Sequence, residues 1–324
     1  MSSKIKEIIR NNSWIWAVLG SLVLWLIIGI ASKNLNFESL IVNIYVVMFL
    51  AIAALGQMLV ITLGRGAIDL SIPGVITISA FLSMGIINGK NSLFIIGLIV
   101  AVCIGAFIGF LNGIAVIHLK IPPIIATMAM GYILLTASLL YSRLFFSVFE
   151  VCPILLIIIR NRIFGIPLMI FFVMILAVVI HIVINNTSYG KSLIAIGQNI
   201  DAARFAGVKI VKVEMITYII SGVLAGITGM LLAARVNGAI VGMGDSYLLE
   251  TVGSVIIGGT LISGGKAVTV GTLTGCLFLG LIITAMLMLG FNLGLQNIAK
   301  GLLIIILLAI GTPWVSRPKY KKNA

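Results

Sequence analysis

The sequence predicts an all-α, polytopic membrane protein with about ten transmembrane helices. Of its 324 residues, 61% are hydrophobic and only 9% are charged, and the mean hydropathy is +1.27. Soluble domains average about 45–50% apolar and about 25% charged residues. The chain therefore carries too few charges to cover a water-facing surface. This composition argues against a soluble enzyme, a disordered chain and a secreted disulfide scaffold.

Apolar segments of transmembrane length follow one another along the chain. A span needs about 20 apolar residues, and its backbone must be hydrogen-bonded internally, which predicts helices. The first apolar run is long and lacks a clear small-residue cleavage site, so we interpret it as a retained helix rather than a signal peptide. No linker interrupts the chain, which predicts a single membrane domain over 1–324. The predicted spans are 14–31, 40–64, 68–88, 92–117, 123–142, 166–185, 213–234, 247–264, 269–289 and 295–313.

The net charge of +13 is explained by membrane topology. No basic block is interleaved with aromatic residues, so no nucleic-acid partner is predicted. Ten spans place both termini on the same side, where 14 of the 21 Lys and Arg residues fall, and Lys300 lies in the last span. The positive-inside rule then predicts that both termini are cytoplasmic. The six positive residues on the opposite side are Lys33, Lys90, Arg143, Arg160, Arg162 and Arg235.

Two stretches between spans are long enough to carry structure of their own. Residues 143–165 form an outer stretch that is basic and partly apolar, and residues 186–212 form a cytoplasmic loop that is the most polar segment of the chain. Ten spans also divide five and five, which is compatible with two inverted five-helix halves. The support for a repeat is limited to the similar short stretches 56–59 and 229–232.

Catalytic and metal-binding patterns are missing from the sequence. The stretch 260–267 superficially resembles a phosphate loop, but it lacks the first glycine and the final Ser or Thr. The eight acidic residues are isolated, and the histidines and cysteines show no zinc or redox spacing. We therefore expect no catalytic residue, no metal and no ATPase site on this chain. The histidines and cysteines are His118, His181, Cys103, Cys152 and Cys276.

Polar residues within the spans are the candidates for a translocation path. Charges at membrane depth are costly and are often functional, but structural anchoring remains open for Asp69, Glu250 and Lys300. Arg65 is a candidate partner for Asp69, and Lys300 has a stem long enough to reach outward to water. Uncharged in-span groups serve either a path or helix packing. The candidate path residues are Gln57, Asp69, Ser71, Asn112, Glu250, Gln296, Asn297 and Lys300.

The cytoplasmic loop predicts a short helix. Asn199 can cap it, Asp201 favours its N-terminus and Gly207 can end it. A loop helix with an apolar face, on a chain without a cytoplasmic domain, either folds back on the bundle or meets a partner. The residues expected to be exposed on this helix are Ala202, Ala203, Phe205 and Ala206.

Several blocks of the sequence point to one family. The loop reads Ala-Ile-Gly-Gln-Asn-Ile-Asp-Ala-Ala-Arg-Phe-Ala-Gly-Val over 195–208, and the third span begins Gly-Ala-Ile-Asp-Leu-Ser-Ile over 66–72. These blocks, in order, resemble those of the permease subunits of bacterial ribose-type sugar ABC importers, in which the second block is usually Gly-Ile-Asp-Leu-Ser. Ala67 and Pro73 depart from the usual pattern. The further matching blocks are 119–127, 258–266 and 271–273.

The resemblance implies a set of partners. Two permease subunits, identical or different, would form the pathway, cytoplasmic ABC ATPase subunits would bind ATP and Mg, and an extracytoplasmic binding protein would deliver the sugar. The chain itself would carry no cofactor and would lie among lipids of the bacterial cytoplasmic membrane. The residues implied for ATPase coupling are Asn199, Asp201, Ala202, Ala203, Arg204, Phe205 and Gly207. The residues that would steer the binding protein, unless they are ordinary surface charges, are Arg143, Arg160, Arg162 and Arg235.

Other functions remain open from the sequence. An ion-coupled secondary transporter would need intramembrane carboxylates arranged as an ion site, for which Asp69 and Glu250 are thin support. A membrane-embedded enzyme lacks its catalytic residues. Within the ABC class, autoinducer-2 and branched-chain amino acids are alternative substrates to a simple sugar.

Overall fold

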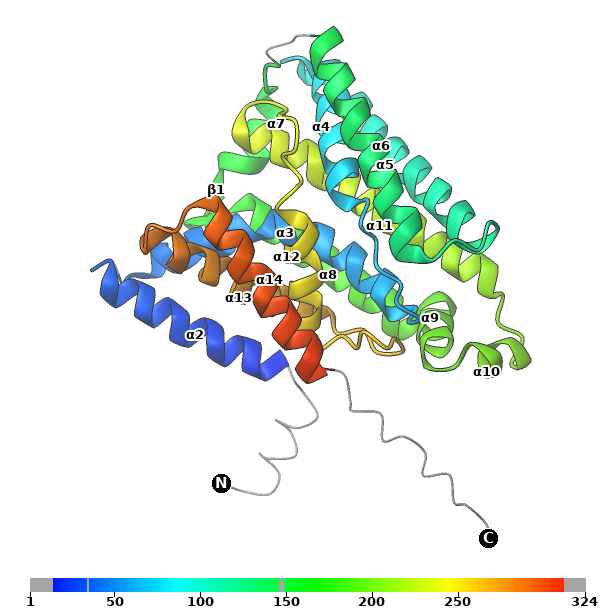
Figure 1. Cartoon of the computed structure of the whole chain (residues 1–324). Coiled ribbons are helices and arrows are strands. Elements are labelled where there is room, and N and C mark those ends of the chain that lie inside the picture. The colour runs from blue at the N-terminus through cyan, green and yellow to red at the C-terminus, as the bar shows by residue number, and fades with distance from the viewer. Residues whose placement is uncertain (1–13, 34, 146–148, 312–324) are drawn as a thin grey trace, which may run out of the picture.

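The chain folds into a bundle of helices in the computed structural model, which describes residues 14–33, 35–145 and 149–311 (Figure 1). The all-α, polytopic class is confirmed. In chain order the elements are α2 (Trp14–Ala31), α3 (Phe37–Thr62), α4 (Ile72–Ile87), η1 (Asn91–Leu93), α5 (Phe94–Ile117), α6 (Pro123–Leu144), α7 (Pro153–Arg160), β1 (Arg162–Ile163), β2 (Ile166–Pro167), α8 (Leu168–Asn186), α9 (Ser188–Gln198), α10 (Ile200–Phe205), α11 (Ile210–Val236), α12 (Tyr247–Ile257), α13 (Thr269–Met288) and α14 (Leu293–Gly311).

Seven helices of the described residues are long and apolar enough to cross a membrane. They are α2, α3, α5 together with η1, α6, α8, α11 and α13. Helices α4 and α12 are apolar but shorter, and α14 has 19 residues. Each of the ten predicted spans thus contains a helix, whereas the number of complete crossings stays a prediction.

Helices α3 and α11 form the centre of the bundle. They are the most buried of the seven spans and pack on each other, while α2, α5, α6 and α8 each expose most of one apolar face. Because lipid replaces water around these faces, exposed Leu, Ile and Phe side chains are expected there. The core of the protein therefore lies along the α3–α11 contact.

The two halves of the chain pack by a similar scheme. Helix α3 packs on α12 and α13, and α11 packs on α4 and α5; α4 packs on α5 and α6, and α12 packs on α13 and α14. The scheme departs at the edges, because α2 packs on α13 whereas α8 packs on α3. This arrangement supports the prediction of two related halves, with the α3–α11 contact between them.

Glycines set the close contacts between helices. A side chain at Gly105 of α5 would collide with the backbone of Gly222 of α11, and one at Gly275 of α13 would collide with the backbone at Ser254 of α12. Small residues allow helices in a membrane to approach until their backbones touch. At these contacts the glycines therefore allow α5 to pack on α11 and α13 to pack on α12.

Two predicted spans are shorter than expected because glycines break them. The third was placed at 68–88, but its helix begins only at Ile72; the eighth was placed at 247–264, but its helix ends at Ile257. The backbone of Gly64, Arg65 and Gly66 has φ of 75°, 56° and 72°, a left-handed conformation that ends α3, and residues 67–71 that follow are not helical. Residues 258–268 form turns in the same way.

The two ends of the bundle are formed by different segments of the chain. The start of α2 and the end of α14 lie on the side that also carries the 258–268 turns (Figure 1), and those turns contact α9. The hairpin of β1 and β2, in which Arg162 pairs with Pro167, lies toward the other side with α7. The terminal basic residues that predict a cytoplasmic location, such as Lys4 and Lys322, lie outside the described residues.

Candidate functional site

A buried polar cluster lies at the break in the third span. The carboxylate of Asp69 accepts hydrogen bonds from the backbone N–H of Ser71 (3.0 Å) and the hydroxyl of Ser71 (2.6 Å) through Oδ1. Its Oδ2 accepts from the hydroxyl of Ser221 on α11 (2.8 Å). Asn112 of α5 donates to Ser71 Oγ (2.8 Å), and Gln57 of α3 accepts from the Asp69 N–H (3.3 Å). We call these five residues the Asp69 cluster.

The cluster joins four of the predicted path residues in a site sealed from solvent. Gln57, Ser71 and Asn112 are fully buried, and Asp69 is 2% exposed. A buried carboxylate is stable only when hydrogen bonds compensate its desolvation, and three donors do so here. Arg65 is not its partner, contrary to the sequence-based expectation.

The sequence reasoning missed the contribution of α11 to this cluster. Buried polar residues recur along that helix at helical spacing, in a stripe formed by Glu214, Thr217, Tyr218, Ser221 and Thr228. Side chains three, four and seven positions apart share one face of a helix. This spacing was the available signal for Ser221, because a polar stripe within an apolar span must face protein rather than lipid.

The cluster retains unused hydrogen-bonding capacity. Among the described residues, buried polar atoms without a partner include Gln57 Nε2, Asn112 Oδ1 and the hydroxyl of Tyr218. Two of these atoms belong to the cluster itself. Tyr218 lies one helical turn from Ser221 on the same face of α11.

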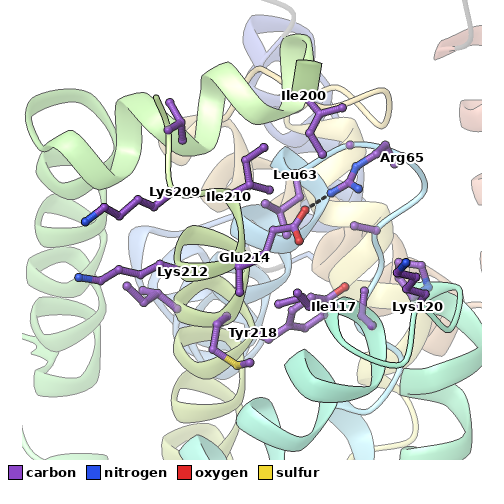
Figure 2. A pocket seen from close by; sticks show the side chains of 18 of the residues that line it. Leu63, Arg65, Ile117, Lys120, Ile200, Lys209, Ile210, Lys212, Glu214 and Tyr218 are labelled. Atoms are coloured by element: carbon purple, nitrogen blue, oxygen red, sulfur yellow. Dashed lines mark hydrogen bonds and ion pairs between the residues drawn. The ribbon is translucent and has the colours of Figure 1, made fainter. Parts of the chain in front are cut away.

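A large cavity opens beside the cluster. Its volume is about 1090 Å³, and it lies between the loop after α3, the end of α5, the α5–α6 turn, α10 and the start of α11. Figure 2 shows the ion pair across it between Arg65 of the loop and Glu214 of α11. The Glu214 side chain is 9% exposed and that of Arg65 is 53% exposed. The pair therefore ties the broken third span to α11.

Three backbone segments meet next to this cavity. The N–H of Gly265 donates to the carbonyl of Thr62 at the end of α3 (2.9 Å), and Gly264 contacts Gly64. Gly197 of α9 lies so close to both segments that a Cβ there would collide with their backbones. We call Gly64, Gly197, Gly264 and Gly265 the glycine junction; it connects the loop helices to both broken spans.

The predicted loop helix is present as α10. Asn199 caps it by accepting from the N–H groups of Asp201 and Ala202 (both 3.0 Å), and Gly207 follows it with φ +80°. Phe205 is 91% exposed. Ala203 was expected to be exposed, but it is buried at 3% because α10 packs on α9 and the start of α11.

The other loop helix, α9, is fixed to the bundle. The hydroxyls of Tyr189 and of Thr217 on α11 share a hydrogen bond of 2.8 Å. Burial raises the pKa of Tyr189 to about 12, with the Thr217 hydrogen bond opposing that shift, so its hydroxyl is protonated at neutral pH. Together with the glycine junction, this bond makes α9 a rigid support for α10.

The remaining path candidates lie in a second place. Lys300 of α14 donates to Glu250 of α12 at 2.6 Å, and both side chains are nearly buried. Lys300 therefore does not reach outward, and Glu250 does not reach water. Gln296 donates to the carbonyl of Phe291 (2.9 Å), and Asn297 is exposed, so neither belongs to the Asp69 cluster.

Three of the four outer arginines lie near the outer end of α3 and α11. Arg160 donates to Asn237 (3.2 Å), and Arg235 lies over the rings of Tyr45 and Phe49. The third, Arg162, pairs with Glu38 in the first turn of α3 (3.0 Å), whereas the fourth, Arg143, is exposed in the last turn of α6.

The described residues contain no group of three or more His, Cys, Asp or Glu side chains placed to hold a metal ion. The two histidines are exposed, Cys152 and Cys276 are buried, and Cys103 is exposed on α5.

Fold and site together define a polytopic transport protein. Broken spans that carry buried polar groups, between two sets of helices that pack by a similar scheme, are an arrangement in which membrane transporters build their sites. Comparison with known families gives the particular one. The family described as branched-chain amino acid transport system, permease component, matches residues 39–311, and the chain belongs to it.

Several of the similar proteins are named as sugar import permeases. The ribose import permease protein RbsC of Bacillus subtilis (strain 168) is 29% identical over 300 residues, which cover 89% of each chain. RbsC of Escherichia coli (strain K12) is 29% identical over 273 residues, or 80% of each chain. The galactose/methyl galactoside import permease MglC of Haemophilus influenzae is 31% identical over 224 residues, or 65% of each chain. No solved structure matches the chain at a significant level.

Proposed function

We propose that this chain is the membrane-spanning permease subunit of an ABC importer for a simple sugar, in the bacterial cytoplasmic membrane. Family membership and the ribose and galactose permeases among the relatives support this proposal. They favour a sugar over autoinducer-2 or a branched-chain amino acid. The chain acts as one membrane domain and takes the substrate from an extracytoplasmic binding protein.

The observation that carries the proposal is α10. It is a capped, rigidly supported helix that exposes Phe205, on a chain whose sequence carries no nucleotide-binding motif. A large apolar side chain presented in this way offers a contact surface for a partner, and an ABC ATPase that binds ATP and Mg is the partner we propose. A movement of the ATPase then displaces α10, and α9 and the glycine junction transmit this displacement to the two broken spans. The coupling residues are Asn199, Asp201, Ala202, Ala203, Arg204, Phe205 and Gly207.

Transport follows from differential binding of two states. ATP binding draws the ATPase subunits together, moves the two α10 helices of a permease pair and favours the outward-open state; hydrolysis restores the inward-open state. The Asp69 cluster supplies polar groups along the path. The outer residues Arg160, Arg162 and Arg235, with Arg143, steer an acidic binding protein into place. Both termini are cytoplasmic.

The first test is transport by the assembled importer. The chain is reconstituted in liposomes with its ATPase and binding protein, and ATP-dependent uptake of labelled ribose and galactose is measured. Uptake that requires both partners and ATP supports the proposal. Ion-driven uptake by the chain alone would instead show a secondary transporter, and uptake of leucine but neither sugar would show an amino-acid permease.

The role of α10 is tested in the same system with Phe205→Ala. Phe205 makes little contact within the chain, so the thermal midpoint should not change, because exposed substitutions alter stability by less than about 0.5 kcal/mol. Uptake and ATPase binding should be lost. The matched control is Ile30→Ala, which removes a side chain that is 71% exposed on α2. Equal activity of the two variants would contradict the docking role of α10.

A further inference from the structure

Tyr218 carries a hydroxyl that the fold alone does not explain. Its side chain is 1% exposed, and it lines the large cavity (Figure 2). The hydroxyl has no hydrogen-bond partner among the described residues. A buried hydroxyl without a partner destabilises the folded protein, because it has lost its hydrogen bonds to water. Phenylalanine would fill the same space without that cost.

The position of Tyr218 links the cavity to the Asp69 cluster. One turn toward the start of α11 lies Glu214, which pairs with Arg65 in the cavity; one turn further along lies Ser221, which binds Asp69. Tyr218 therefore stands between the open cavity and the buried polar groups.

The unused atoms of Tyr218 and of the Asp69 cluster indicate the chemistry of a ligand. Gln57 Nε2 can donate, Asn112 Oδ1 can accept, and the Tyr218 hydroxyl can do both. The charged groups Asp69, Glu214 and Arg65 are already engaged with one another or with hydroxyls. What remains suits an uncharged molecule with several groups that both donate and accept, which is the description of a polyhydroxyl compound.

We propose that the Tyr218 hydroxyl binds a hydroxyl group of the transported sugar, and that the cavity is the cytoplasmic part of the translocation path. The inference rests on the proposed sugar importer and identifies where, within this chain, the sugar is met. Tyr218 would be a contact of the path rather than a structural residue.

The test compares Tyr218→Phe with wild type in the reconstituted importer, using labelled ribose and galactose. The variant keeps the ring and removes only the hydroxyl. We expect the uptake rate to fall by roughly ten-fold, as expected for one lost hydrogen bond of about 1.4 kcal/mol. The thermal midpoint should stay the same or rise, because an unpartnered buried group is removed.

Tyr189→Phe provides the benchmark for a structural hydroxyl. It removes the hydrogen bond to Thr217, so its thermal midpoint should fall. If Tyr218→Phe lowers the midpoint in the same way, the hydroxyl has a structural partner, such as an ordered water, and the inference is overturned. Unchanged uptake by Tyr218→Phe overturns it as well. If the wild-type importer transports neither ribose nor galactose, that result contradicts the proposed function itself, and the inference about Tyr218 is then overturned as well.

Discussion

At the scale of single residues, Asp69 acts as the acceptor that organises the break in the third span. Three donors from two segments converge on one carboxylate, so its two oxygens hold the start of α4 against α11. The geometry explains why a carboxylate is kept at a position where most membrane proteins would avoid one.

Two substitutions of Asp69 distinguish the effect of losing the whole side chain from the effect of changing its hydrogen bonds. Asp69→Ala leaves buried donors of Ser71 and Ser221 without acceptors, at about 1–3 kcal/mol each, and should deplete folded protein from the membrane. Asp69→Asn keeps the shape but turns an amide N–H₂ toward one hydroxyl. We expect it to fold and to lower sugar uptake by about ten-fold. Full activity of both variants would show that the cluster has no part in transport.

Removing Arg65 and removing Glu214 should lower the free energy of unfolding by different amounts. Arg65→Ala leaves a nearly buried carboxylate unpaired, which costs up to about 3 kcal/mol. Glu214→Gln leaves an arginine that is half exposed and that water can solvate, so the loss should stay below about 1 kcal/mol. Denaturant unfolding of the two variants and of the double variant measures the difference. Equal losses would mean that Glu214 is solvated in the folded protein.

The sequence predicted several single residues for reasons that can be stated. Asn199 and Gly207 were predicted because capping and chain reversal depend on local chemistry. Gln57, Asp69, Ser71 and Asn112 were predicted because polar groups within apolar spans are rare. Their mutual contacts could not be predicted, since they depend on which helix faces which. The prediction for Arg65 was wrong for the same reason. Asp69 was the candidate partner because it is close in sequence, whereas the actual partner, Glu214, lies 149 positions away.

At the scale of elements, the glycine junction connects the loop helices to the two broken spans. The contacts are made by backbone atoms, so no side chain can yield when one segment moves. A displacement of α10 is therefore carried by α9 into the end of α3 and into the 258–268 turns together.

Gly197→Ala should disrupt this connection. The added Cβ would meet the carbonyl of Thr62 and the backbone of Gly265, so α9 must move away. We expect the ATPase to bind but sugar to stimulate its hydrolysis several-fold less, as read from ATP turnover with and without loaded binding protein. Gly238→Ala is the control, because open space surrounds that glycine and its φ is not positive. Normal stimulation in Gly197→Ala would rule out the junction as the route.

Element boundaries were predicted well where hydrophobicity ends and poorly where backbone conformation ends a helix. Helices α8 and α13 lie within two residues of their predicted limits. The spans at 68–88 and 247–264 were drawn too long, because a hydropathy pattern does not register the non-helical backbone of residues 67–71 or the positive φ at Gly259. The outer stretch 143–165 contains α7 and the first strand of the hairpin, which are too short to leave a periodic signal.

At the scale of the whole molecule, the fold presents two chemically different ends. One end carries α10, the large cavity and the glycine junction, and the other carries α7, the hairpin and three clustered arginines. The proposed function requires that the first end faces the cytoplasm and the second the binding protein.

Cysteine labelling tests this orientation directly. Cys103, Cys152 and Cys276 are replaced, and Phe205→Cys or Phe164→Cys is introduced; the two phenylalanines are 91% and 99% exposed at opposite ends. In intact spheroplasts, a membrane-impermeant maleimide should react with the residue at 164 within minutes. The residue at 205 should react only after the membrane is opened. The reverse pattern would invert the topology and refute ATPase docking at α10.

The Glu250–Lys300 pair also has a consequence for how the protein is made. A lone lysine in the middle of a membrane helix costs about 2.5–3.5 kcal/mol to insert. Glu250 leaves the ribosome before Lys300, so the carboxylate is already in place on α12 when α14 arrives. Because α14 packs chiefly on α12, this charge pairing would draw the final helix out of the translocon. The order of synthesis thus becomes part of the folding pathway, because the lysine enters the bundle only after its carboxylate partner is in place.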